Sequence, residues 1–191
     1  MASVMPPDTK MLPPDSPRWK SFSVHFGTPE QVPERLASWR ESIGGPDEAS
    51  NWSDLWEQFL HQGTITDAAY AAVPHIVREL ERIAPRNRLN YLVEVAEIEA
   101  ARHETTSPRL PPDLGEAYHA AIAHARQLAV ECLSLEWPKI EFRYLLSVLA
   151  SLHGHGVLGD LIFYLDALCG ECEKCGGCVY PEDIQESGYV K

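Results

Sequence analysis

The stretch DLGEAYHAAIAHARQLAVECLSLEWP, residues 113–138, contains the most regular apolar pattern of the chain. Its apolar residues are spaced by four and three positions in turn, at Leu114, Tyr118, Ala121, Ala125, Leu128, Cys132 and Leu135. This spacing puts one apolar stripe along an α-helix and predicts that the helix packs lengthwise against another helix. Asp113 and Glu116 predict a capping box at its beginning. Trp137-Pro138 predicts its end.

Similar patterns on both sides of this stretch predict further helices. Their ranges are 29–42, 54–62, 67–80, 88–102, 141–152 and 157–168. Thr28, Ser53 and Thr66 are expected to cap the first three of them, because their side chains accept hydrogen bonds from free backbone N–H groups. Residues 21–26 alternate between apolar and polar, but a lone strand needs a partner, so this segment is expected to lie extended on the helices. Short helices with Gly- or Pro-marked turns favour an all-α fold of stacked helical hairpins.

The chain of 191 residues is 45% hydrophobic and 23% charged, which is typical of one ordinary globular domain. Within it, residues 1–18 are expected to form a proline-rich disordered or extended arm, residues 19–168 the helical domain, and residues 169–191 a cysteine-rich tail. The N-terminus has no apolar core of a signal peptide, and no stretch reaches the roughly 18 apolar residues of a membrane span. A cytoplasmic protein with reduced thiols is therefore expected.

The formal net charge of −12 bears on the partner. Binding to nucleic acid needs lysine and arginine side chains that displace counterions from phosphates, so the charge argues against a nucleic-acid partner. It favours a basic protein partner. A negative surface that serves only solubility would give the same composition.

Four of the five cysteines lie in CGECEKCGGC, residues 169–178, at Cys169, Cys172, Cys175 and Cys178. Two C-x-x-C turns supply four thiolates, which is the donor set of a tetrahedral zinc site. Because four protein ligands leave no position for water, such a Zn²⁺ would be structural and not catalytic. The sequence therefore predicts a zinc ion that holds the tail together.

Several alternatives to this zinc site remain open. Only Glu173 and Lys174 separate the two C-x-x-C turns, so His153 or His155 is a candidate to replace one cysteine as ligand. An iron–sulfur cluster or reversible thiol–disulfide chemistry would use the same cysteines. The fifth cysteine, Cys132, lies on the apolar stripe and is expected to be a buried small hydrophobe.

Other titratable and aromatic residues carry weaker signals. Glu94, Glu97, Glu99 and Glu104 follow one another along the helix expected at 88–102, and a solvated face is the favoured interpretation, with an acidic docking patch second. Glu99 and His103 share a helix face and are expected to be solvated as well. The pair Glu116 and His119 matches half of a di-iron motif that lacks its second copy. The aromatic residues Trp52, Trp56, Tyr70 and Tyr91 fit either the core or the rim of a binding surface.

Two segments add a resemblance to a known group of proteins. The segment LWEQFLHQGTITDAAYAAVPHIVREL, residues 55–80, resembles the HEAT-like helical repeats of bacterial proteins. The segment EFRYLLSVLASLHGHGVLGDLIFYLDALCGECEKCGGC, residues 141–178, resembles the C-terminal end of the same group, where a helical hairpin runs into a cysteine pair of zinc-knuckle type. The resemblance implies a HEAT-like α-solenoid. Some of these proteins are immunity proteins that act against secreted toxins, so it also implies a binder more than an enzyme.

These observations predict a protein-binding module and not an enzyme, because no nucleophile elbow, phosphate-binding glycine loop or zinc-protease motif is present in the sequence. The most specific expectation is an immunity protein that binds a basic domain of a secreted bacterial toxin and occludes its active site. A thiol-redox or metal-handling protein that works through the 169–178 cysteines is the alternative function.

Overall fold

Helices dominate the part of the chain that the structure, a computed structural model, describes: residues 10–164, 170–171 and 178–179. The α-helices are α1 (Val32–Ser42), α2 (Glu48–Trp56), α3 (Asp67–Leu80), α4 (Leu89–Ala101), α5 (Gly115–Cys132), α6 (Lys139–Leu152) and α7 (Gly156–Phe163). Three 3-10 turns are η1 (Pro17–Ser21), η2 (Pro29–Gln31) and η3 (Pro85–Asn87). The predicted all-α class is confirmed.

Two short antiparallel ribbons accompany the helices. One joins β1 (Leu60–His61) to β2 (Thr64–Ile65), and the other joins β3 (Gly170–Glu171) to β4 (Cys178–Val179). Most of the cysteine-rich tail lies outside the described residues. No helix in the described ranges is long and apolar enough to cross a lipid bilayer.

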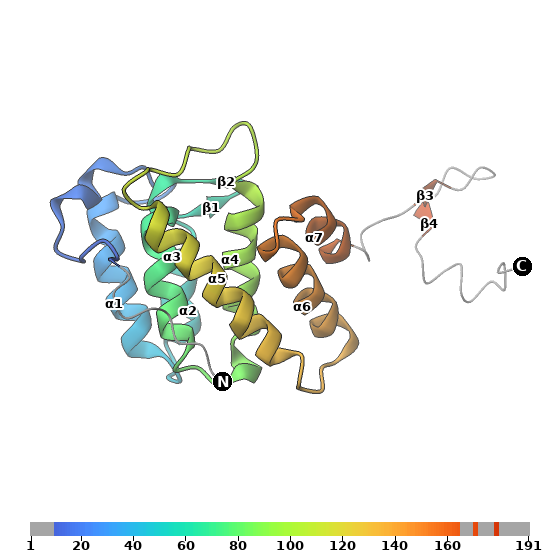
Figure 1. Cartoon of the computed structure of the whole chain (residues 1–191). Coiled ribbons are helices and arrows are strands. Elements are labelled where there is room, and N and C mark those ends of the chain that lie inside the picture. Colours follow the sequence, from blue (N-terminus) through green and yellow to red (C-terminus); the bar gives the residue numbers. More distant parts are fainter. Residues whose placement is uncertain (1–9, 165–169, 172–177, 180–191) are drawn as a thin grey trace, which may run out of the picture.

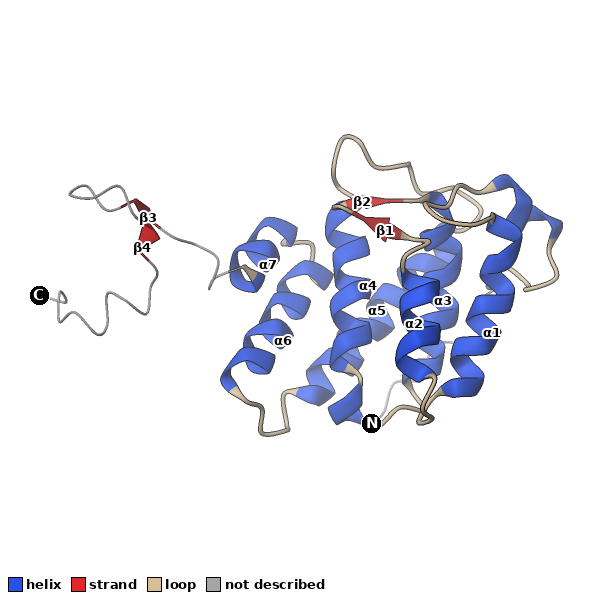
Figure 2. Cartoon of the chain, turned by 180° about the vertical axis from the view of Figure 1, so that it is seen from behind, coloured by secondary structure: helices blue, strands red, loops and turns tan. Residues whose placement is uncertain are grey.

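Helix α4 lies near the centre of the helical part of the chain (Figure 1). Helix α3 contacts α1 and α5, while α4 contacts α5, α6 and α7. Seen from behind, α2 and α6 again lie on opposite sides of α4 (Figure 2). One face of α4 is therefore flanked by walls that come from distant parts of the sequence.

The apolar stripe of α5 forms much of the contact with α3, as predicted. Every stripe residue from Leu114 to Cys132 is buried, and Leu135, which follows the helix, is half-buried. The rings of Tyr118 and Tyr70 meet edge to face, with 5.2 Å between their centroids. The predicted capping box is wrong, because α5 begins at Gly115 and the Asp113 carboxylate accepts a hydrogen bond of 2.8 Å from Arg18 instead.

The helix predicted at 54–62 is also wrong in its bounds. Helix α2 begins at Glu48, so Ser53 lies inside it, and it ends at Trp56. The chain then forms the β1–β2 hairpin, in which Leu60 pairs with Ile65. Gln62 and Gly63 at its tip both have positive φ, of 49° and 75°, the backbone conformation that a tight two-residue hairpin turn needs.

The N-terminal segment covers the beginning of α3. Residues 10–16 form neither helix nor strand, and the Trp19 indole is buried and donates a hydrogen bond of 2.9 Å to the Pro13 carbonyl. The segment 21–26, expected to be extended, is so only in part, because Ser21 still belongs to η1 while Phe22 has extended backbone and is buried. Its Ser23 donates from both its backbone N–H and its hydroxyl to the Asp67 carboxylate at 2.6 Å. Asp67 therefore ties this segment to the first turn of α3.

Glycines allow α7 to approach two other helices closely. A Cβ atom on Gly159 would lie 2.0 Å from the Ser151 hydroxyl of α6, and one on Gly156 would lie 3.2 Å from the Ala100 Cβ of α4. The Ser147 hydroxyl also donates a hydrogen bond of 2.8 Å to the Gly159 carbonyl. These contacts place α7 directly beside the C-terminal half of α4.

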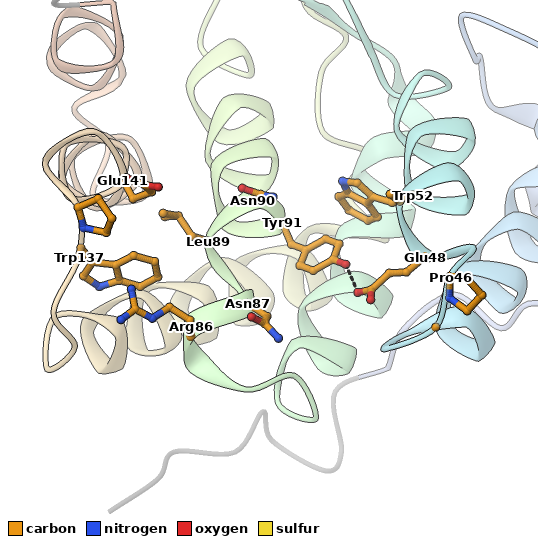
Figure 3. Close-up of a pocket in the computed structure, with 13 residues that line it drawn as sticks. Pro46, Glu48, Trp52, Arg86, Asn87, Leu89, Asn90, Tyr91, Trp137 and Glu141 are labelled. Atoms are coloured by element: carbon orange, nitrogen blue, oxygen red, sulfur yellow. Dashed lines mark hydrogen bonds between the residues drawn. The ribbon is translucent and has the colours of Figure 1, made fainter.

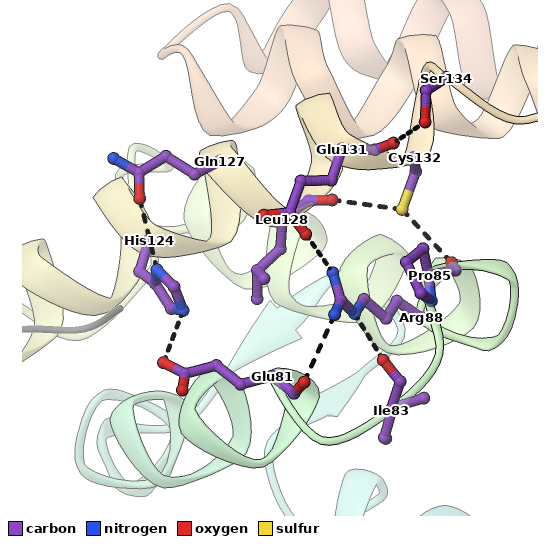
Figure 4. Close-up of polar contacts among 10 residues, drawn as sticks. All are labelled: Glu81, Ile83, Pro85, Arg88, His124, Gln127, Leu128, Glu131, Cys132 and Ser134. Carbon is purple, nitrogen blue, oxygen red and sulfur yellow. Dashed lines mark hydrogen bonds and ion pairs between the residues drawn. The ribbon is translucent and has the colours of Figure 1, made fainter. Parts of the chain in front are cut away.

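A buried guanidinium holds the connection between α3 and α4 (Figure 4). Arg88 donates to the Ile83 carbonyl at 2.8 Å, to the Glu131 carboxylate at 2.6 Å and to the Glu81 carbonyl at 3.4 Å. Its side chain is only 7% exposed. Buried polar groups need such partners, so Arg88 fixes the end of α3, the turn η3 and the beginning of α4 to α5.

Replacing Arg88 by alanine is expected to lower the free energy of unfolding by about 2–4 kcal/mol, because two backbone carbonyls lose a charged donor at a buried position. Urea unfolding followed by circular dichroism measures this. Arg82→Ala is the matched control. Arg82 pairs with Glu79 at 2.9 Å but its side chain is 73% exposed, so the loss there is expected to stay below about 1 kcal/mol. Equal losses in the two variants would contradict the role given to Arg88.

Candidate functional site

One side of η3 and α4 carries a line of polar residues that extends from one cavity to a second cavity. Asn87, Asn90, Glu94 and Glu97 follow at steps of three and four, which puts them on one side of the helix. The cavity near the N-terminal end of α4 has a volume of about 570 Å³. The cavity near its C-terminal end has a volume of about 290 Å³. We call them the aromatic cavity and the acidic cavity after the residues that line them.

The aromatic cavity lies between α2, the η3–α4 segment and the beginning of α6 (Figure 3). Its aromatic lining consists of Trp52, Tyr91 and Trp137. Its polar and charged lining consists of Glu48, Arg86, Asn87, Asn90 and Glu141. An apolar hollow with a few polar groups at its edge is the usual form of a binding site.

The aromatic lining is continuous with the core. The rings of Trp52 and Tyr91 meet edge to face, with 4.7 Å between centroids, and Trp39 lies behind both at 4.8 and 5.4 Å. Trp39 is fully buried, as is Tyr70, which lies away from this cavity between α3 and α5. The sequence left open whether these aromatic residues belong to the core or to the rim of a binding surface. Tyr70 belongs to the core, while Trp52 and Tyr91 are core residues whose edges line a cavity.

Glu48 holds Tyr91 in place from α2. The Tyr91 hydroxyl donates a short hydrogen bond to one oxygen of Glu48, and the backbone N–H of Gly44 donates to the other at 2.7 Å. Burial, followed by this hydrogen bond, raises the pKa of Tyr91 well above its ordinary value. Tyr91 is therefore a hydrogen-bond donor at neutral pH, and Glu48 is its acceptor.

Glu94 lies between the two cavities and is not solvated. Burial, with a smaller contribution from the negative charge of Glu97, raises its pKa to about 9, although the Trp52 indole partly offsets the rise. One of its carboxyl oxygens is buried without a hydrogen-bond partner in the described residues. The predicted solvated face is wrong here, because the walls from α2 and α6 remove water from this side of α4.

The acidic cavity contains three carboxyl groups from two helices and the turn after α4. Glu97, Glu104 and Asp160 line it, together with Leu60 of the hairpin and Tyr164 after α7. Burial and then the charge of Asp160 raise the pKa of Glu97 to about 7. Burial and then the charge of Glu104 raise the pKa of Asp160.

Mutual repulsion is therefore built into the acidic cavity. Among the described residues, no lysine, arginine or histidine forms an ion pair with Glu97, Glu104 or Asp160. A carboxyl group that lies close to another carboxyl group and has no cation beside it is more stable in its protonated form, and its pKa is therefore raised. A cation that entered this cavity would remove that repulsion.

Glu99 also belongs to the glutamates of α4, but its carboxylate is buried and fully hydrogen-bonded. Glu99 is 3% exposed. Arg102, at the end of the same helix, donates to both its oxygens at 2.8 and 2.9 Å, and the Tyr118 hydroxyl of α5 donates to it at 2.9 Å. Burial alone would raise its pKa, but these hydrogen bonds outweigh burial and lower it. The prediction that Glu99 and His103 are both solvated is wrong. Glu99 is a buried carboxylate whose charge is balanced by Arg102, and it lies 3.7 Å from the exposed His103.

The predicted metal site falls almost entirely outside the described residues. This holds for Cys169, Cys172 and Cys175, while the backbone of Cys178 lies in β4, opposite Glu171. The candidate replacements His153 and His155 are exposed at the α6–α7 turn. In the described ranges, no group of three or more histidine, cysteine, aspartate or glutamate side chains is arranged to hold a metal ion.

Cys132 is the buried hydrophobe that its position in the stripe predicts. Its thiol donates to the Leu128 carbonyl at 3.2 Å and lies 3.4 Å from the Pro85 carbonyl. Burial raises its pKa, which keeps the thiol protonated and unreactive. Glu116 is exposed on α5, as is His119.

Comparison of the chain with protein-family models, curated proteins and solved structures gave no match. The site therefore rests on its own geometry. Sequence reasoning did not single out several of its residues, namely Glu48, Arg86, Asn87, Asn90, Trp137, Glu141 and Asp160. They lie in α2, the η3–α4 segment, the beginning of α6 and α7, and only the packing of these elements brings them together.

Replacing Glu94 by glutamine is expected to change how stability depends on pH. The folded chain keeps a proton up to about pH 9 that the unfolded chain releases near its ordinary pKa of 4.5. Between these values the unfolded state binds fewer protons, so stability falls as pH rises, by at most about 1.4 kcal/mol per pH unit. Glutamine removes this dependence, so the variant gains stability over the wild type at alkaline pH and the gain shrinks toward acidic pH.

Chemical unfolding between about pH 5 and pH 9 measures this difference. Glu116→Gln makes the same chemical change at an exposed position of α5 and is the matched control. Curves for Glu94→Gln and the wild type that stay parallel over this range would contradict a raised pKa at Glu94.

Proposed function

We propose that the protein is a binding module that holds a basic protein partner against the face of α4. In its most specific form, it is an immunity protein that covers the active site of a secreted bacterial toxin. The helical pairs α1–α2, α3–α4 and α5–α6 would then act as a HEAT-like stack, a scaffold that exposes one helix face to its partner.

The acidic cavity is the observation that carries this proposal. Glu97 and Asp160 have raised pKa values because of burial and neighbouring negative charge, and they have no cationic partner in the described residues. The carboxyl groups line one cavity from two neighbouring helices, α4 and α7, so one long cationic side chain can reach both. Binding a lysine or arginine there replaces repulsion by attraction, which favours a basic partner.

The charge of the whole chain acts in the same direction. A net charge of −12 draws a positively charged partner toward the surface and increases the rate of encounter at low ionic strength. Enzymes that act on nucleic acids carry basic side chains on the surface that binds the phosphate backbone. A toxin of that class would present the complementary surface.

The same proposal includes a structural zinc ion in the tail, held by Cys169, Cys172, Cys175 and Cys178. The donor set of four thiolates suits Zn²⁺, and the β3–β4 ribbon brings the backbone of Cys178 beside Glu171, the residue before Cys172. These cysteines would supply a closed shell and stabilise the end of the chain. Their use in thiol-redox chemistry remains the alternative function.

Metal analysis of the purified chain is expected to find about one zinc ion per molecule, and almost none in the Cys172→Ser/Cys175→Ser variant. The control variant Cys132→Ser is expected to bind as much zinc as the wild type. Cys132 ends α5, and its thiol is buried against the Leu128 and Pro85 carbonyls, away from the metal ligands of the proposal. A zinc-free wild type whose thiol titre falls and recovers with oxidant and reductant would overturn the zinc site and favour the redox function.

The immunity proposal is tested by co-expression with candidate secreted toxin domains, chosen from the genes that neighbour the gene of this protein. We expect survival of the cells and a stable complex. The variant Glu97→Gln/Glu104→Gln/Asp160→Asn is expected to weaken the complex at least about tenfold, because it removes the charges of the acidic cavity. The matched control Glu30→Gln/Glu34→Gln/Glu116→Gln changes net charge equally at exposed positions elsewhere and is expected to bind within about threefold of the wild type.

Wild-type protein that gives neither protection nor a complex would overturn the immunity proposal. Equal weakening by both triple variants would show that overall charge, and not the acidic cavity, drives association.

A further inference from the structure

We infer that the aromatic cavity is a pocket for an arginine side chain, which the basic partner inserts between Trp52, Tyr91 and Trp137. The inference rests on the proposed function, since it names the side chain by which the partner is recognised on the α4 face. It concerns the cavity at the opposite end of α4 from the three carboxyl groups considered above.

The two aromatic side chains at the sides of the cavity are held by hydrogen bonds at their polar ends. The Trp137 indole N–H donates to the Cys132 carbonyl at 2.8 Å, and the Tyr91 hydroxyl donates to Glu48. Each ring therefore keeps its orientation. The half-buried Trp137 offers its ring surface to the cavity, while Tyr91 and Trp52 contribute only the edges of buried rings. A pocket whose walls are already ordered loses little conformational entropy when a ligand enters.

A guanidinium already lies on one of these walls. The Arg86 guanidinium carbon is 4.8 Å from the centroid of the Trp137 ring, within the range of a cation–π interaction. Arg86 is an exposed side chain of the turn η3, and Figure 3 shows it below Trp137 at the edge of the cavity. The chain itself thus demonstrates that the Trp137 face accepts this group, and Arg86 competes with any arginine from outside.

Hydrogen-bond acceptors surround the cavity on the sides that the rings leave open. Glu48 and Glu141 lie on opposite sides of it, with Asn87 and Asn90 between them (Figure 3). A guanidinium carries five N–H donors in one plane, and carboxylate and amide oxygens are suitable acceptors for them. The two carboxylates outnumber the single cationic side chain of the lining, so the cavity favours a cation.

Arginine fits this lining better than lysine does. The guanidinium is flat, is less strongly hydrated than an ammonium group, and stacks on aromatic faces while it donates hydrogen bonds at its edge. An ammonium group is a compact point charge that would leave much of the flat walls unfilled. A neutral side chain would forgo the attraction of Glu48 and Glu141.

The test uses the full chain and three peptides, acetyl-Gly-X-Gly-amide, in which X is arginine, lysine or citrulline. Citrulline has nearly the shape of arginine but no charge. Nuclear magnetic resonance follows the indole N–H signals of Trp52 and Trp137 during titration. We expect saturable shifts of both with the arginine peptide, binding of the lysine peptide that is roughly 3- to 30-fold weaker, and no saturation with citrulline.

Three variants locate the binding. Trp137→Leu and Glu141→Gln are expected to weaken the arginine peptide by roughly 3- to 30-fold, and Arg86→Gln is expected to strengthen it several-fold because the internal competitor is gone. Glu116→Gln on α5 is the control and is expected to bind as the wild type does. Arg86 is exposed, so its variant keeps the test valid if Trp137→Leu fails to fold.

Each contrary result has its own meaning. Equal binding of the arginine and citrulline peptides, tighter binding of lysine, or indole signals that do not respond would overturn the arginine pocket. Weakening by Arg86→Gln would overturn the competition with Arg86. If the toxin is still bound through the acidic cavity, only this inference fails, whereas arginine binding by a chain that recognises no toxin would leave the pocket and overturn the immunity proposal.

Discussion

The buried guanidinium of Arg88 is the interaction on which the face of α4 depends. It joins the end of α3 and the beginning of α4 to Glu131 on α5, at a point where the chain reverses direction. The turn η3 lies between these contacts and carries Arg86 and Asn87 into the aromatic cavity. A group that stabilises the fold thus sets the position of residues that line the proposed binding pocket.

The glutamates of α4 are removed from water in two different ways, one with hydrogen-bond partners and one without. On the side toward α5, Glu99 receives three hydrogen bonds and becomes part of the core at no cost in repulsion. On the opposite side, Glu94 and Glu97 are shielded from water but not matched by cations, so part of the folding free energy is given up there. Such an unfavourable arrangement is common at functional sites, where a ligand completes it.

Local pattern was sufficient to predict the helices that pack along their length. The stripe of α5 is buried where the spacing of its apolar residues places it. Thr66 does take the N-cap position of α3, but the predicted capping hydrogen bond is wrong, because its hydroxyl donates to the Gln58 carbonyl at 3.2 Å. Prediction failed where distant contacts compete with local ones: Asp113 binds Arg18 instead of capping α5, and the turn at Gln62-Gly63 ends a helical pattern. The carboxyl groups were misjudged for the same reason, because nothing near Glu94 in the sequence reveals that α2 and α6 cover it.

The close packing of α7 through Gly156 and Gly159 has a consequence for the electrostatics of the site. Asp160 belongs to the same short helix, so its distance from Glu97 follows from how closely two backbones can approach. A single methyl group at Gly159 would push α7 outward and move Asp160 with it. The strength of the negative field at this end of the molecule is therefore tuned by residues that carry no charge and no side chain.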